Sequence, residues 1–175
     1  MADICAVFDA QGYTVGGEFR IKELAVVSHK LTISMLCDIP VKRKDLTYKE
    51  RKSENVIYQK TGLPLNSDKD YWHKYESEEK VKKVYDGEHA MAAMYEWVRE
   101  DDRPLIGFKN PQMAPILEKW GIPGIELPQK EDKFFDMIYK MFLTSQCDYH
   151  KKPESRCALK KAQALWYINN QKKLM

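Results

Sequence analysis

Three residues in the C-terminal part of the chain carry the donor types that bind transition metals. They are Cys147, His150 and Cys157, spaced as C-x2-H-x6-C ahead of a segment with helical apolar periodicity. Zinc favours thiolate and imidazole donors, and a structural zinc site usually has four protein ligands. The spacing therefore predicts most of a zinc site, with the fourth ligand coming from elsewhere in the fold or from water. The alternative is a pair of buried thiols beside a surface histidine.

The composition is typical of a single globular domain covering residues 1–175. The chain has 175 residues, of which 43% are hydrophobic and 11% aromatic, which is enough to form a core. No apolar run approaches the roughly 20 residues of a membrane-spanning helix, and the N-terminus shows no secretory signal. We therefore expect no membrane partner and a location in the cytoplasm or nucleus, where clustered Cys and His more often bind metal than form disulfides.

Basic residues are clustered, although the formal net charge is only +3. One cluster is Lys42-Arg43-Lys44, and Tyr and Trp residues are frequent near several of the clusters. Basic groups beside aromatic rings suit a phosphate backbone with stacked bases. A solvated lysine-rich surface explains the same pattern equally well.

The elements that must position these residues can be read from apolar periodicity. Apolar runs at 4–9, 19–28 and 31–37 predict an antiparallel meander, with a Gln-Gly turn after the first run. Helices are predicted at 48–61, 78–84, 87–99, 112–120, 132–143 and 158–169, and further strands at 105–108 and 125–127. This order of elements predicts an α/β fold with a mixed β-sheet flanked by helices.

The layout resembles the DEDD-type 3′–5′ exonucleases of the ribonuclease H-like superfamily, whose active members hold two divalent ions with four carboxylates. The resemblance lies in an acid ending the first strand (Asp9), a second strand reading KELA, a Leu-Ile-Gly-Phe strand and a late Cys-Ala-Leu-x-x-Ala. The first motif of the superfamily, Asp-x-Glu, ends here in Gln11, and Met113 stands where a second Asp is expected. In the last motif Arg156 and Lys161 replace the His and the Asp. The resemblance therefore implies that exonuclease chemistry is lost and assigns no catalytic residue.

The metal-binding pattern resembles that of Maelstrom-type domains, a degenerate branch of this superfamily that acts in germline small-RNA (piRNA) silencing. These domains carry a Glu-Cys-His-Cys zinc site, with the Glu on the second strand and the last Cys before the final helix. The resemblance implies a structural Zn²⁺ held by Glu23, Cys147, His150 and Cys157. The alternative for Glu23 is an outward-facing strand carboxylate, and the alternative for Asp9 is a turn-forming residue.

The resemblance implies a zinc-stabilised domain that binds single-stranded RNA in RNA handling or small-RNA silencing. Three cations are expected around the place of the lost metal ions. Together with the basic cluster, the candidate phosphate contacts are Lys42, Arg43, Lys44, Lys109, Arg156 and Lys161. Two other functions remain open: an endonuclease that cuts single-stranded RNA without the lost carboxylates, and a scaffold that binds protein partners through surface aromatics.

Overall fold

The fold is built on a six-stranded mixed sheet with the strand order β4-β3-β2-β1-β5-β6. The computed structural model describes residues 3–63, 65, 84–102, 104–128, 133–141, 150 and 156–173. The strands are β1 (Ala6–Val15), β2 (Glu18–Val27), β3 (Thr32–Asp38), β4 (Val84–Asp86), β5 (Ile106–Phe108) and β6 (Gly124–Glu126). The first three strands form the expected antiparallel meander, and the later strands join it in parallel.

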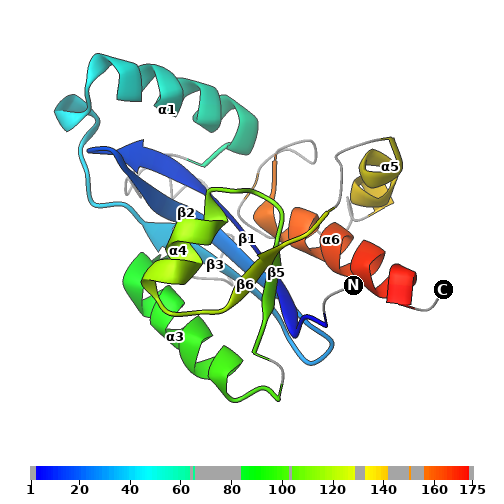
Figure 1. The fold of residues 1–175 in the computed structure, drawn as a ribbon. Helices are drawn as coiled ribbons and strands as arrows, with labels where there is room; N and C mark the ends of the chain where they lie inside the picture. Colours follow the sequence, from blue (N-terminus) through cyan, green and yellow to red (C-terminus); the bar gives the residue numbers. More distant parts are fainter. Residues whose placement is uncertain are drawn as a thin grey trace, which may run out of the picture.

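Helices cover both faces of this sheet (Figure 1). They are the 3₁₀ turn η1 (Arg43–Asp45) and the helices α1 (Tyr48–Thr61), α3 (Gly87–Arg99), α4 (Met113–Lys119), α5 (Lys133–Met141) and α6 (Ala158–Lys173). Helices α3 and α4 pack on one face, whereas α6 packs on β1 and β2 from the other face, with α5 beside it. The α/β class with a mixed sheet is thus confirmed. No helix within the described ranges is both long and apolar enough to cross a bilayer.

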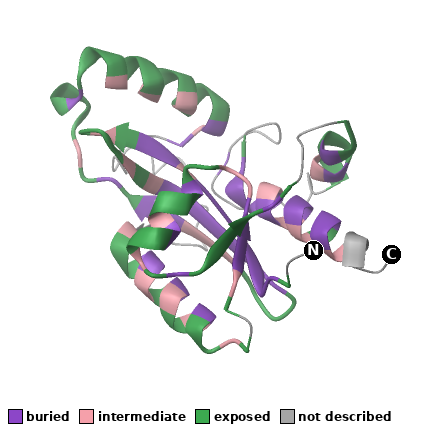
Figure 2. Ribbon diagram, in the orientation of Figure 1, coloured by how far each residue is buried: buried purple, intermediate pink, exposed green. Residues whose placement is uncertain are grey.

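Burial is concentrated in the sheet and in the inner side of α6 (Figure 2). The longest buried runs are the first half of β1 and the second half of β2, both of which are covered on their two faces. Helix α1 is different, because nearly all of its side chains are exposed and Thr61 is its one fully buried residue. The sheet strands β1 and β2 are therefore the rigid support of any site on the α6 face.

Strand β1 is longer than expected, and the predicted turn at residues 11–12 is wrong. The chain turns at Gly16 and Gly17 instead, where φ is 60° and 77°. A two-residue hairpin loop with positive φ at both positions matches the right-handed twist of the strands, and glycine adopts it without strain. Asp9 consequently lies in the middle of β1 and is buried, so its interpretation as a turn residue is wrong as well.

A β-bulge in β2 decides which way Glu23 faces. Gln11 pairs with Glu23 but Gly12 pairs with Ile21, which leaves Lys22 as the extra residue. Ile21 and Leu24 both pack in the core under α3 and α4, although strict alternation would put residues three apart on opposite faces. The bulge therefore reverses the alternation and turns Glu23 toward α6.

Two further expectations about elements need correction. Strand β4 was not predicted, and the helix predicted at 78–84 falls largely outside the described residues. In the helix at 132–143 the apolar residues Phe134, Phe135, Ile138, Met141 and Phe142 are predicted to face inward. In α5, Phe135 and Ile138 are buried, which agrees with this prediction, but Phe134 and Met141 are exposed, and Phe142 lies outside the described residues. Helix α5 has apolar residues on more than one face, and the face with Phe135 and Ile138 is the one that packs toward α6.

Candidate metal centre

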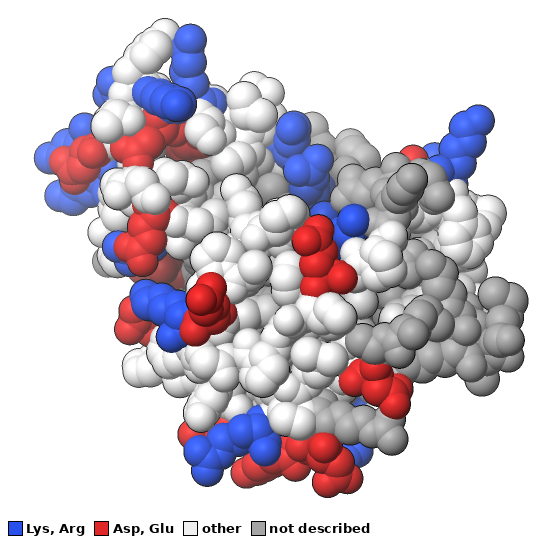
Figure 3. Space-filling view, viewed as in Figure 1, with Lys and Arg blue, Asp and Glu red and all other residues white. Residues whose placement is uncertain are grey.

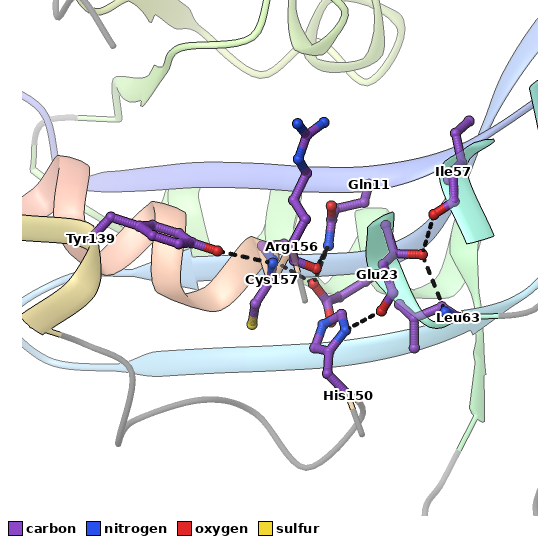
Figure 4. Close-up of polar contacts among 10 residues, drawn as sticks. Gln11, Glu23, Ile57, Leu63, Tyr139, His150, Arg156 and Cys157 are labelled. Carbon is purple, nitrogen blue, oxygen red and sulfur yellow. Dashed lines mark hydrogen bonds and ion pairs between the residues drawn. The ribbon is translucent and has the colours of Figure 1, made fainter. Parts of the chain in front are cut away.

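Three of the four expected metal ligands converge on the α6 face of the sheet. Glu23 comes from β2, Cys157 directly precedes α6, and His150 lies a few residues earlier in the chain (Figure 4). One donor atom from each residue lies within 4.8 Å of the others, and all three residues are buried. The fourth expected ligand, Cys147, lies outside the described residues. The structure therefore brings together a carboxylate, an imidazole and a thiol that could hold a metal ion.

The two oxygens of Glu23 have different partners. Oε1 accepts hydrogen bonds from the Ala158 amide at 2.5 Å and from the Gln11 side chain at 3.0 Å. Oε2 lies 2.6 Å from Nε2 of His150. The backbone and Gln11 thus fix the carboxylate through one oxygen, and the other oxygen faces the imidazole.

The second ring nitrogen of His150 is held by helix α1. Nδ1 lies 2.5 Å from the carbonyl oxygen of Thr61, the last residue of α1. A carbonyl only accepts, so Nδ1 carries a proton and donates it. Histidine ligands in metal sites commonly donate their other ring N–H to a carbonyl or carboxylate, which fixes the tautomer and the ring orientation. This arrangement leaves Nε2 as the nitrogen available to a metal ion.

Without a cation, Glu23 and His150 form a buried ion pair. Burial alone would raise the pKa of Glu23, but hydrogen bonds from His150, Ala158 and Gln11 and the charge on His150 hold it below its ordinary value. Burial alone would lower the pKa of His150, but hydrogen bonds and charges from Cys157 and Glu23 raise it to about 10. A metal ion binding here would have to displace the proton on Nε2, so metal affinity would fall at low pH.

Asp9 and Gln11, which the resemblance aligns with the first exonuclease motif, lie next to this group. Asp9 and Gln11 of β1 lie on the same face of the sheet as Glu23 of β2, since they pair with Ala25 and Glu23, respectively. Burial raises the pKa of Asp9 to about 7, the positive charge of Lys161 opposes that rise, and the negative charge of Glu23 adds to it. Oδ1 of Asp9 is buried and has no hydrogen-bond partner among the described residues. Lys161 on α6 therefore lies close enough to Asp9 to interact with its charge.

Three of the candidate phosphate contacts are consecutive residues around η1, ahead of α1. Lys42, Arg43 and Lys44 are exposed around η1, and Arg43 is engaged by Glu54 at 3.0 Å and by Asn55 at 2.9 Å. Among the described residues on the face in Figure 3, acidic and basic side chains lie side by side, with no extended patch of one sign. The structure does not gather these three residues with the cations near α6.

Arg156 and Lys109 are two further candidate cations. Arg156 is exposed, and its guanidinium points away from Glu23 and His150 (Figure 4). Lys109 directly follows β5 and is partly buried. Of the three cations expected around the place of the lost metal ions, Arg156 directly precedes the ligand Cys157, and the charge of Lys161 acts on Asp9.

Sequence reasoning missed two features of the site. Gln11 was interpreted only as a lost acid, but its Nε2 atom contacts both Glu23 and the carbonyl oxygen of Arg156. The contact from the Thr61 carbonyl to His150 was not predicted, because a backbone oxygen leaves no signal in the residue types. By contrast, Cys5 and Cys37, which their positions in apolar runs predict to be buried small hydrophobic residues, are indeed buried in the hydrophobic core.

Comparisons with protein-family models, with curated proteins and with solved structures found no match.

Proposed function

We propose that this chain is a zinc-stabilised domain of the ribonuclease H-like, Maelstrom type that binds single-stranded RNA and has lost exonuclease chemistry. The observation that carries the proposal is the position of Lys161. In the resemblance it replaces the last metal-binding Asp, and in the structure its charge acts on Asp9, the one remaining carboxylate of the motif. An ammonium group there repels divalent cations and attracts phosphate.

The donor set supports zinc as the metal. Glu23, His150 and Cys157 offer one oxygen, one nitrogen and one sulfur, and zinc accepts all three in tetrahedral sites. Cys147 would complete four protein ligands. A site closed by four side chains leaves no position for a reacting water, so its role would be structural: tying α6 to β2 and to the end of α1. Zinc content of the purified chain, at one ion per molecule, is the expected result.

Binding to RNA is tested by a salt series. If Lys109, Arg156, Lys161 and the three residues at 42–44 all neutralise phosphates of a single strand, log Kd should rise with log salt by about 0.7 per contact, or about 4 in total. The variant Lys161→Met should lower that slope by about 0.7, whereas Lys133→Met, an exposed position on α5, should leave it unchanged. Binding that is absent, or flat with salt, would contradict the proposal.

The same purified protein and RNA distinguish an RNA-binding domain from the alternative, an endonuclease. Labelled single-stranded RNA is incubated with the protein, with and without EDTA. Internal cleavage products would favour the enzyme, and intact RNA in a shifted band would favour the binding domain.

The alternative as a scaffold for protein partners is disfavoured by burial. Trp97, Trp120 and Trp166 are all partly buried and pack against the two main hydrophobic cores. Tyr71 and Trp72 lie outside the described residues. The described tryptophans are therefore used mainly for folding.

A further inference from the structure

Gln11 makes two contacts that connect the metal group to both of its supporting elements. Its Nε2 atom donates to Oε1 of Glu23 at 3.0 Å and to the backbone oxygen of Arg156 at 2.7 Å. Glu23 belongs to β2, and Arg156 directly precedes the ligand Cys157 at the start of α6. One side-chain amide on β1 therefore spans from a ligand on the sheet to the segment that carries another ligand (Figure 4).

A side-chain amide satisfies both contacts. An NH₂ group has two protons and can donate to both oxygens at once, whereas a carboxylate has no proton to donate and a hydroxyl has one. A glutamate at this position would face Glu23 and the Arg156 carbonyl with acceptors only. The glutamine is therefore matched to its two neighbours.

The hydrogen bonds to Oε1 determine which oxygen of Glu23 a metal can use. The Ala158 amide and Gln11 both bind Oε1, whereas Oε2 faces Nε2 of His150. A ligand whose other lone pairs are fixed by neighbours loses less side-chain freedom on binding metal. The Ala158 contact comes from the backbone, so Gln11 supplies the side-chain part of this fixation.

We infer that Gln11 is a positioning residue of the metal centre: it holds Oε1 of Glu23 and the Arg156 carbonyl, so that Oε2 of Glu23 and Sγ of Cys157 meet the same ion. This inference rests on the proposed metal site. It assigns to Gln11 a contribution to metal affinity and coordination, without direct contact with the ion.

The test is the variant Gln11→Met, which keeps the length of the side chain and removes the donor. A second variant, Gln11→Asn, keeps the amide but shortens its reach by one methylene. Gln59→Met, on the exposed side of α1, is the matched control. Zn²⁺ affinity is measured by competition with a chromophoric chelator, Co²⁺ spectra report the coordination geometry, and near-UV circular dichroism shows that each variant is folded.

Both Gln11 variants are expected to bind Zn²⁺ about 10- to 100-fold more weakly, the range found for residues that orient metal ligands. The Co²⁺ ligand-field bands of both variants should also shift, because Glu23 and Cys157 would no longer be held in the same geometry around the ion. If Gln11 only stabilised the fold, the variants would be less stable but their Co²⁺ spectra would not change. Gln59→Met should match the unaltered chain in both measurements. Tight Zn²⁺ binding by the unaltered chain with equal affinity and unchanged spectra in the Gln11 variants would overturn this inference alone. A folded, unaltered chain that takes up neither ion would overturn the metal site and the inference together.

Discussion

The buried carboxyl group of Asp9 makes stability depend on pH in an unusual direction. Its pKa is raised from 3.8 to about 7 in the folded chain, first by burial, against the opposing charge of Lys161. In the unfolded chain the carboxyl ionises near its ordinary value of about 3.9. Between these two values the folded state binds more protons than the unfolded state, so the free energy of unfolding falls as pH rises.

The size of this effect follows from the shift. A shift of about 3 units corresponds to about 4 kcal/mol, at about 1.4 kcal/mol for each unit. The variant Asp9→Asn removes the titrating group. The free energy of unfolding of the unaltered chain, relative to that of the variant, should therefore fall by about 4 kcal/mol between about pH 4 and about pH 8 and then level off. A constant offset is expected in addition, because an amide at this site has its own hydrogen-bond requirements.

Urea denaturation at a series of pH values measures this difference. Both proteins are compared in EDTA, because a nearby cation would favour the charged form of Asp9 and reduce the effect. Asp102→Asn, at an exposed loop position, is the control and should differ from the unaltered chain by less than about 0.5 kcal/mol at every pH. A difference between the Asp9 variant and the unaltered chain that does not vary with pH would refute the burial of this carboxyl beside β2 and α6.

Three further outcomes are expected. Chelation with EDTA should lower the melting temperature of the unaltered chain but not that of Cys157→Ala, because the variant has already lost a metal ligand. Differential scanning fluorimetry measures both melting temperatures. Equal shifts in the two proteins would speak against the metal centre. Gly12→Ala should lower the free energy of unfolding by about 3 kcal/mol or more in urea denaturation, since an added Cβ would lie 1.8 Å from the backbone oxygen of Arg20. Gly87→Ala is the control, because a Cβ at that position meets nothing within 4 Å and should be tolerated. Lys22→Met should raise the free energy of unfolding by about 3 kcal/mol at neutral pH, because burial lowers the pKa of Lys22 to about 8 against the opposing charge of Asp38. This gain should shrink as pH rises above 8, where the buried lysine loses its proton. A gain that does not change with pH would contradict the prediction.

The parts of the fold that the sequence predicts well are those with local signals. Helix α1 has the predicted bounds because Thr47 and Glu50 form a capping box at its start and Gly62 takes the left-handed conformation at its end. The hairpin between β1 and β2 was misplaced because Gln-Gly and Gly-Gly are both plausible turns, and only pairing with β2 distinguishes them. Strand β4 has three residues and pairs in parallel with β3, so its signal is not local either.

The site shows the same division between residue types and their surroundings. The donors Glu23, His150 and Cys157 were expected from their types and spacing together with the resemblance, and the structure brings them together. That Glu23 faces α6 depends on the bulge at Lys22, which no residue pattern indicated. The roles of Gln11 and of the Thr61 carbonyl arise from contacts between elements far apart in the sequence.

The separation of these residues along the chain has a consequence for the order of assembly. Glu23 and the Ala158 amide that binds it are 135 residues apart, and Thr61 and His150 are 89 residues apart. A nascent chain can therefore complete its first three strands long before the ribosome has delivered the partners of Glu23. Before α6 is synthesised, Glu23 and the apolar residues around it are exposed on one face of the sheet. Exposed apolar surface of this kind promotes aggregation or chaperone binding.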